Sequence, residues 1–314
     1  NNFYNGIFYQ PLTKVRIRKN ISIQSLKNNF RNIKIDNKKY SVLNKKFDLN
    51  LSLQQYSKLF DDFSKNIKQG KTYQIKIAQT YSKKGKVNAV ELFWKLMKMN
   101  ESPESFLIRD KNYSIISCSP ETLILKKKNL IKTKPIAGTL RKTKSLNKNK
   151  ALSFFRKNEK ETKEHNMIVD MERNDLSKIC KTGSVKIEKL KRVEEYRDLF
   201  HYVSTIKGLI KKNITNHEII SSLMPGGSVI GCPKISTIQL LNNKEKNDRN
   251  IYTGSFGVIH SNGDMRFNIM IRTLLNFKNN INLSVASGVI LGSTAKKEYN
   301  ENYIKAKSLL ELFH

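Results

Sequence analysis

Two kinds of hydrophobic periodicity alternate along the chain. Apolar residues spaced by three and four predict an amphipathic helix over residues 53–67, which Gly70 ends. Its apolar positions are Leu53, Tyr56, Leu59, Phe60, Phe63 and Ile67. The same spacing predicts helices over residues 91–99, 151–180 and 294–313. We expect the last helix to face the core with Ala295, Tyr299, Tyr303, Ala306, Leu310 and Phe313.

Alternating apolar and polar residues predict strands between these helices. The predicted strands cover residues 73–81, 183–188, 251–259, 266–275 and 281–291. Residues 105–125 are expected to form two strands around a turn, with a further turn opening at Ser119-Pro120-Glu121. Residues 142–150 are polar and rich in lysine, which predicts an exposed loop. Strands that pair in hairpins and are interrupted by long helices favour an α+β fold over a βαβ array.

The chain is strongly basic, with 59 Lys and Arg against 26 Asp and Glu among its 314 residues, a formal charge of +33. Such a charge is typical of proteins that bind nucleic acid. Lysine outnumbers arginine by 47 to 12, however, whereas specific recognition of bases and phosphates favours the planar fork of arginine. No zinc-finger, helix-turn-helix or RNP motif accompanies the charge. We therefore expect lysine-rich surface charge and no specific nucleic-acid partner.

Several other classes of protein are disfavoured. No stretch approaches the roughly 18 apolar residues that a bilayer span needs, so we expect no membrane insertion. Cys118, Cys180 and Cys232 are far apart and form no C-x-x-C pair, which excludes a disulfide framework and a zinc ribbon and favours the cytoplasm. The chain also lacks a Ser/His/Asp nucleophile elbow, a dinucleotide G-x-G-x-x-G motif and a cysteine in a nucleophile turn.

Two pairs of glutamates are the first candidates for chemistry. Glu161 and Glu164 lie on the predicted helix 151–180, and Glu298 and Glu301 lie on the last helix. The i, i+3 spacing puts both carboxylates of a pair on one helix face. Four carboxylates brought together could hold Mg²⁺, which takes one or two carboxylate ligands and keeps several waters. The alternative is two solvated helix faces.

Three further features have both a structural and a functional interpretation. Residues 224–234 form the only dense Gly/Pro/Ser loop, but Cys232 and Pro233 stand where a phosphate loop needs Lys-Ser/Thr. Arg272 interrupts an apolar strand, so it either binds an anion or lies at an exposed position. His201 is either a satisfied core histidine or a site residue.

Six motifs follow one another along the chain. They are Lys134-Pro-Ile-Ala-Gly-Thr139, Glu164-His-Asn-Met-Ile-Val-Asp170 with Arg173-Asn-Asp-Leu176, His201-Tyr-Val-Ser204, Pro225-Gly-Gly-Ser-Val-Ile-Gly-Cys-Pro-Lys234, Ile271-Arg-Thr273 and Glu298-Tyr-Asn-Glu301-x-x-x-Lys305. Taken in order, these motifs closely resemble those of the chorismate-utilising enzymes. This family includes component I of anthranilate synthase and of aminodeoxychorismate synthase, isochorismate synthase and salicylate synthase. The resemblance implies a two-layered antiparallel-sheet sandwich with outer helices. Residues 51–314 would form the chorismate-binding catalytic domain, preceded by a short N-terminal segment, residues 1–50.

The resemblance also implies a role for individual residues. Glu164 and Glu301 resemble the direct Mg²⁺ ligands, with Glu161 and Glu298 beside them in water-bridged or acid/base roles. The residues implied to line the substrate pocket are Gln74, Gly138, Thr139, Tyr252, Arg272, Ser287 and Gly288, with Arg272 and Tyr252 gripping the enolpyruvyl carboxylate. His201 would sit near the leaving group, and Lys305 near the metal-bound carboxylate. The implied chemistry is loss of the C4 hydroxyl of chorismate with attack of a nucleophile on the ring.

The nucleophile is inferred from Gln74. Family members that add water carry a lysine base at this position, and glutamine cannot deprotonate water, so ammonia is expected. Lys76 lies two residues on and keeps the same strand face, which leaves a displaced base as an alternative. Because none of the cysteines lies in a nucleophile turn, the ammonia should come from a separate glutamine amidotransferase subunit.

The product is inferred from two further motifs. The Pro225-Gly-Gly-Ser loop and Phe267-Asn268 resemble aminodeoxychorismate synthases of the para-aminobenzoate and folate pathway, whereas Ala137 resembles anthranilate synthases of tryptophan synthesis. Aminodeoxychorismate is the expected product and anthranilate the alternative. A degenerate basic protein that binds RNA or a partner is the alternative from another class.

Overall fold

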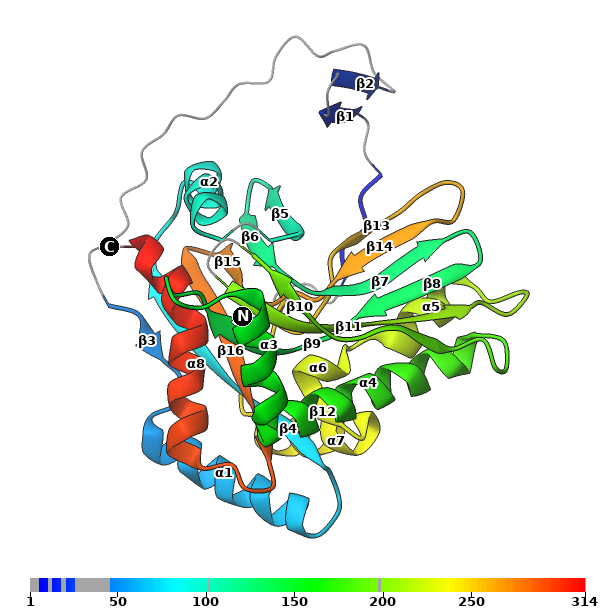
Figure 1. The fold of residues 1–314 in the computed structure, drawn as a ribbon. Helices are drawn as coiled ribbons and strands as arrows, with labels where there is room; N and C mark the ends of the chain where they lie inside the picture. Colours follow the sequence, from blue (N-terminus) through cyan, green and yellow to red (C-terminus); the bar gives the residue numbers. More distant parts are fainter. Residues whose placement is uncertain are drawn as a thin grey trace.

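Two antiparallel sheets of seven strands each form the framework of the fold (Figure 1). This is a computed structural model, which describes residues 6–10, 13–17, 21–25, 46–100, 102–196 and 199–313. The first sheet has the order β12 (Gly231–Cys232), β4 (Gln74–Lys84), β16 (Asn280–Ile290), β15 (Thr273–Phe277), β6 (Tyr113–Ser119) and β5 (Glu104–Arg109), with β3 (Asp48–Leu49) beside β4. The second has the order β10 (Lys186–Glu195), β11 (Leu199–Leu209), β8 (Leu130–Lys134), β7 (Thr122–Lys127), β14 (Met265–Asn268) and β13 (Gly257–Ile259), with β9 (Ile136–Arg141) beside β11. The expected α+β class is confirmed.

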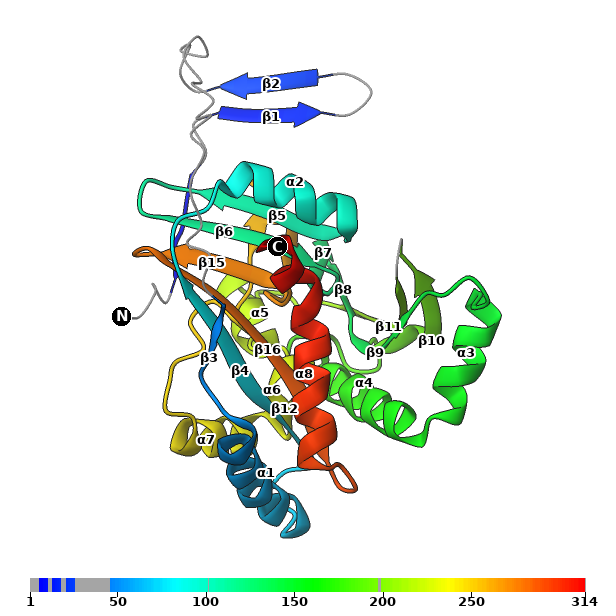
Figure 2. The same cartoon turned by 90° about the vertical axis from the view of Figure 1, so that its left-hand side faces the viewer.

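Helices pack against both sheets. α1 (Leu53–Lys68) and α8 (Ala295–Leu310) pack against each other and against β16, and Figure 2 shows α8 lying along that strand. α2 (Ala89–Met99) covers β6, and α4 (Glu159–Ile179) packs against β9 and β11. The remaining helical segments are α3 (Lys148–Lys157), α5 (Asn216–Leu223), α6 (Gly227–Ile230), α7 (Lys234–Lys244) and a 3₁₀ turn at Glu311–Phe313. None of the helices within the described ranges is long and apolar enough to cross a membrane.

Only parts of residues 1–50 are described. β1 (Thr13–Ile17) and β2 (Ile21–Ser25) pair with each other in an antiparallel hairpin. The stretches 1–5, 11–12, 18–20 and 26–45, on which the expected N-terminal segment also falls, lie outside the described residues.

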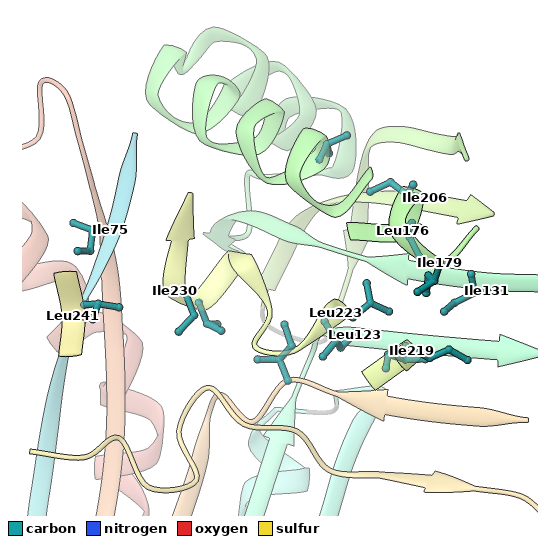
Figure 3. Packing of buried hydrophobic residues seen from close by; sticks show 14 of the residues in the cluster. Ile75, Leu123, Ile131, Leu176, Ile179, Ile206, Ile219, Leu223, Ile230 and Leu241 are labelled. Atoms are coloured by element: carbon teal, nitrogen blue, oxygen red, sulfur yellow. The ribbon is translucent and has the colours of Figure 1, made fainter. Parts of the chain in front are cut away.

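The main hydrophobic core joins the two sheets with α1, α4 and α5. Figure 3 labels several of its members, among them Ile75, Leu123, Ile131, Leu176 and Ile206. Burying side chains of this size stabilises the fold by about 1.5–3 kcal/mol each. On β4, Ile75 and Ile77 belong to this core. Strand alternation therefore places Gln74 and Lys76 on the opposite face of β4.

The chain crosses from one sheet to the other at two neighbouring places. Residues 120–121 connect β6 to β7, and residues 269–272 connect β14 to β15. The backbone N–H of Ile269 donates to the carbonyl oxygen of Glu121 at 3.1 Å, which holds the two crossings side by side. Glu121 and Arg272 therefore both lie at the junction of the sheets.

These crossings correct three predicted strands. Residues 105–125 form three strands instead of two, because β6 belongs to the first sheet and β7 to the second. Residues 266–275 form β14 and β15 in different sheets, since Arg272, with a φ of 50°, turns the chain between them. Residues 251–256 are turn and irregular backbone, so only β13 of the predicted strand 251–259 forms.

The predicted helix 151–180 is two helices. The Asn158 side chain accepts a hydrogen bond from the backbone N–H of Glu161 at 3.3 Å, which ends α3 and caps α4. α3 begins at Lys148, inside the predicted loop, and the strand predicted over residues 183–188 forms later, as β10. The elements predicted over residues 53–67, 73–81, 91–99, 281–291 and 294–313 are confirmed by α1, β4, α2, β16 and α8.

The buried face of α8 differs from the predicted stripe. Its buried residues are Glu298, Asn302, Ala306 and Leu309, whereas Tyr303, expected in the core, is 53% exposed. The polar residues tolerate burial because they have partners. Lys160 donates to Glu298, and the Asn302 side chain donates to Gln79 Oε1 at 2.7 Å.

Candidate active site

The four candidate glutamates lie on two helices that face each other. The cap at Asn158 starts α4 just before Glu161 and Glu164, and α8 carries Glu298 and Glu301. Lys160 links the two helices, because its Nζ lies 2.7 Å from Glu298 Oε1 and 3.6 Å from Glu301 Oε2. The pairing of glutamates expected from the i, i+3 spacing therefore produces one carboxylate cluster, not two solvated faces.

Lysines compensate this cluster. Lys76 Nζ lies 2.5 Å from Glu164 Oε1, and Lys305 Nζ lies 2.7 Å from Glu301 Oε1. Lys305 also donates to the carbonyl oxygen of Ala286 on β16, at 3.0 Å, which anchors α8 to the first sheet. Together with Lys160, these ammonium groups allow several carboxylates to lie close together in a poorly solvated site.

The pKa values of the carboxyls are pushed apart. Burial, together with the negative charges of Glu164 and Glu301, raises the pKa of Glu161 to about 7. Burial also acts to raise the pKa of Glu301, but Lys305 and Lys160 outweigh it and hold that pKa at about 2. Lys76 likewise outweighs burial and lowers the pKa of Glu164. At neutral pH Glu164 and Glu301 are thus ionised, whereas Glu161 exchanges its proton readily.

The residues present fit a divalent cation. Within the described ranges no three His, Cys, Asp or Glu side chains form a ready metal cage. Mg²⁺ does not require one, since it binds through one or two carboxylates and keeps its waters. Glu298 Oε2 is buried and lacks a hydrogen-bond partner among the described residues. The negative charges of Glu164 and Glu301 repel that of Glu161, and a bound cation would reduce this repulsion. Glu164 and Glu301 are the ionised pair that would hold the ion.

Three polar side chains pack closely against Gly288 on β16, and we call this place the Gly288 corner. A Cβ at this position would lie 2.6 Å from Gln74 Nε2, 2.7 Å from Lys76 Nζ and 3.0 Å from Glu164 Oε1. Gln74 is fully buried, and neither its amide nitrogen nor its amide oxygen has a partner among the described residues. The absence of a side chain at Gly288 thus allows three polar groups to converge beside the strand.

The Ser287 side chain does not point to the Gly288 corner. Its hydroxyl lies 3.0 Å from the Tyr56 hydroxyl on α1, on the opposite face of β16. The resemblance placed Ser287 in the substrate pocket, but its side chain belongs to the packing between α1 and the sheet.

A second group of site residues lies on β9 and β11. Thr139 Oγ1 lies 3.0 Å from His201 Nδ1, across the pairing of these strands. Burial, with the positive charge of Arg272, lowers the pKa of His201 well below its usual value, so the ring is neutral. Gly138 has a φ of 109°, and a Cβ there would lie 2.9 Å from the Phe155 ring and 3.1 Å from Glu161 Oε2. Gly138 and Thr139 therefore border the carboxylate cluster on one side and His201 on the other.

Arg272 and Glu121 form the third group, at the sheet junction. Arg272 Nη1 is buried without a hydrogen-bond partner among the described residues, which leaves it available to an anion. Burial raises the pKa of Glu121 to about 7, and this carboxyl feels the charges of Lys76 and Arg272. Tyr252 is 8% exposed, and burial raises its pKa to about 12, so it remains a hydrogen-bond donor.

Sequence reasoning missed Glu121, Lys160 and His165. Glu121 was part of a predicted turn, although a carboxylate directly after a buried strand is itself a signal. Lys160 lies four residues before Glu164 on the same helix, a spacing that could have been noticed. His165 is fully buried between Ala137 O, at 3.1 Å, and Ser204 Oγ, at 2.7 Å, and so positions the strand that carries Gly138 and Thr139.

The glycines of the loop 224–234 serve packing. A Cβ on Gly227 would lie 1.6 Å from the Met171 methyl carbon on α4, and one on Gly226 would lie 2.6 Å from Ile269 Cδ1. The cap backbone of Gly231 has a φ of 131°, and a Cβ there would lie 2.1 Å from the carbonyl oxygen of Gln74. The loop thus fixes the position of Gln74 and does not form a phosphate cradle.

Comparisons with known proteins establish the family of the chain. Residues 12–311 match the family of chorismate binding enzymes, so the chain belongs to that family, as the motifs predicted. It is 34% identical over 259 residues to the "Anthranilate synthase component I-like protein" of Synechocystis sp., covering 82% of this chain and 53% of the relative. It is 33% identical over 252 residues to aminodeoxychorismate synthase component 1 of Bacillus subtilis, covering 80% and 54%. The chain spans about half the length of these curated relatives.

Solved structures share the fold. The crystal structure of anthranilate synthase component I from Streptococcus pneumoniae superposes with a TM-score of 0.77 and 29% identity, covering 85% of this chain and 60% of that one. The menaquinone-specific isochorismate synthase from Escherichia coli also gives a TM-score of 0.77, with 20% identity, covering 88% of this chain and 64% of that one. The latter likeness shows the fold alone.

Proposed function

We propose that this chain is the Mg²⁺-dependent component I of an aminodeoxychorismate synthase. It would aminate chorismate to 4-amino-4-deoxychorismate with ammonia from a glutamine amidotransferase subunit. One observation carries the choice of amination: the Gln74 amide is fully buried, lies at the Gly288 corner and lacks a partner among the described residues. Its oxygen is thus available to accept a hydrogen bond from a small polar nucleophile.

The competing nucleophile is water, which needs a base. Glutamine has no basic group at neutral pH, and Lys76 is the cationic half of an ion pair with Glu164. A protonated lysine cannot accept a proton from water. Neutral ammonia is a much stronger nucleophile than water and can attack without first losing a proton to a base. The displaced-base alternative is therefore disfavoured even though Lys76 does lie in the site.

The remaining groups would bind the substrate and transfer a proton. Arg272, whose guanidinium has a free donor, would grip the enolpyruvyl carboxylate with the Tyr252 hydroxyl beside it. Mg²⁺ held by Glu164 and Glu301 would neutralise the ring carboxylate and the charge that develops on the departing oxygen. Glu121, with a pKa of about 7, can give a proton to the C4 hydroxyl as it leaves as water. Neutral His201 can orient the ring without adding charge.

Ala137 and Asn268 bear on the identity of the product. Ala137 offers no amine that could attack the ring first, so ammonia would add directly. Asn268, which supported aminodeoxychorismate, bonds Glu104 O at 3.1 Å and Phe256 N at 2.9 Å, so its side chain supports the fold. Relatives carry both names. Anthranilate, formed when pyruvate is also eliminated, remains the second candidate, favoured by Ala137.

Product identification with defined nitrogen donors tests the proposal. The purified chain with chorismate and Mg²⁺ should form 4-amino-4-deoxychorismate from ammonium, and should use glutamine only when an amidotransferase subunit is added. Anthranilate would establish the alternative product. Isochorismate would contradict amination. A folded chain that converts no chorismate with high ammonium would favour the degenerate binding protein.

A further inference from the structure

Lys76 lies at the centre of the site, and neither the family match nor the motifs assign it a role there. Its side chain is 8% exposed, and its charge acts on Glu164, Glu301 and Glu121. We propose that the Lys76 ammonium is a built-in cation that binds the ring carboxylate of the ligand directly, next to the divalent cation. This inference rests on the proposed function, because it concerns the same substrate.

The position of Lys76 is fixed from both sides of the strand. Lys76 pairs with Gly288 in the β4–β16 register. Its carbonyl oxygen accepts a hydrogen bond from Arg249 Nη2 at 2.7 Å, and Arg249 is held in turn by Glu245 at 2.6 Å. The flanking Ile75 and Ile77 are buried in the main core. The ammonium is therefore presented from a rigid strand, which is how a binding group avoids an ordering cost when the ligand arrives.

Lys76 and Gln74 both have hydrogen-bond donors that the described residues leave unused. An ammonium has three N–H donors, and within the described residues Lys76 spends one on Glu164. The Gln74 amide group, which would lie 2.6 Å from a Cβ at Gly288, has none of its donors in use there. A group that satisfies both neighbours must offer two acceptors and negative charge. A carboxylate does so, with one oxygen for each donor.

The competing interpretation is that Lys76 only neutralises Glu164. In that case the ion pair would be structural, and the ligand carboxylate would depend on Mg²⁺ alone. The two interpretations differ when no metal is bound. A direct contact predicts that replacing Lys76 weakens chorismate binding in excess EDTA, whereas a purely structural ion pair predicts that the variant binds as the wild type does, through Arg272.

The test is calorimetric binding of chorismate to the purified chain, first with Mg²⁺ and then with excess EDTA, for the wild type and Lys76→Met. Removing a hydrogen bond to a charged group should weaken binding in EDTA by roughly tenfold or more. Lys76→Arg should restore part of the loss. The matched control is Lys83→Met: Lys83 is on the same strand and is equally buried, with 6% exposure, but its Nζ lies over the rings of Phe47 and Phe313 at 5.5 and 5.6 Å.

The outcomes test the role of Lys76 separately from the proposed function. Unchanged binding by Lys76→Met in EDTA, or wild-type binding that requires Mg²⁺, would overturn the role of Lys76 and leave the proposed function standing. No wild-type binding under either condition would contradict the proposed function itself. Thermal melting checks that the variants fold. Should Lys76→Met fail to fold, Lys76→Gln keeps an N–H donor for Glu164 without the charge and is held to the same criterion.

Discussion

The backbone N–H of Ile269 donates to the carbonyl oxygen of Glu121 at 3.1 Å, and this bond joins the two segments where the chain crosses between its sheets. The crossing at residues 269–272 ends on Arg272, so an acid and a guanidinium are delivered to the same junction from distant parts of the sequence. Lys76 connects the carboxylate cluster of α4 and α8 to this junction, because its charge acts on both Glu164 and Glu121. The positions of the candidate site residues thus depend on sheet topology as well as on the spacing of residues along the helices.

Loss of either ionised carboxylate of the proposed metal pair should abolish activity and leave the fold intact. Glu164→Ala and Glu301→Ala each remove half of the protein ligation of the ion. The measurement is Mg²⁺-dependent product formation together with a melting curve. Glu159→Ala is a suitable control, since Glu159 lies on α4 but pairs with Lys163 at 3.0 Å on the exposed face. Retained turnover in either site variant would refute the metal assignment.

Glu121→Gln should change how stability depends on pH. Between pH 4.5 and 7 the folded chain keeps a proton on Glu121 that the unfolded chain has released, because burial raises this pKa to about 7. The free energy of unfolding therefore falls as pH rises through that window. The variant removes this titration, so it should exceed the wild type at about pH 8 by up to about 3 kcal/mol, and much less at about pH 5.

Denaturant unfolding of both proteins at the two pH values measures this difference. Other carboxyls with raised pKa values, such as Glu172, contribute equally to both proteins and cancel. Equal pH dependence would show that Glu121 is not held protonated. The same variant should lose turnover, because an amide cannot supply the proton to the leaving hydroxyl.

Gln74→Lys should introduce some isochorismate. A lysine here would place an amine at the Gly288 corner, where the nearby ammonium of Lys76 favours its neutral, basic form. Chromatography of the products from chorismate measures this. Isochorismate from the wild type, at levels equal to those of the variant, would show that Gln74 does not exclude water.

Gly288→Ala and Ser287→Ala should have different effects, because the two substitutions change opposite faces of β16. The added methyl of Gly288→Ala would lie within 3.0 Å of three polar atoms and displace their side chains, so binding of chorismate should be lost. Ser287→Ala removes only the hydrogen bond to Tyr56 and should cost about 1 kcal/mol of stability with little change in kcat/KM. A larger loss of activity in Ser287→Ala than in Gly288→Ala would reverse this assignment of faces.

The sequence was most informative where periodicity and packing agree. The apolar spacing of α1 and the alternation of β4 and β16 predicted those elements, and the paired glutamates predicted a carboxylate cluster. The change of sheet at Arg272 was not predicted, because apolar residues continue on both sides of it from Ile269 to Leu275. At Glu121 a turn was predicted, but no local pattern shows that the chain passes to the other sheet there. The break at Asn158 was missed since the helical spacing resumes directly after it. The buried face of α8 was misjudged because its polar residues are paired by groups far away in sequence.

The central claim is that this site joins ammonia, and not water, to the ring of chorismate. The most direct measurement is mass spectrometry of the product formed from chorismate, Mg²⁺ and ¹⁵N-ammonium in H₂¹⁸O. The account predicts an amino product that contains ¹⁵N and no ¹⁸O. A hydroxylated product that carries ¹⁸O and no ¹⁵N would contradict it.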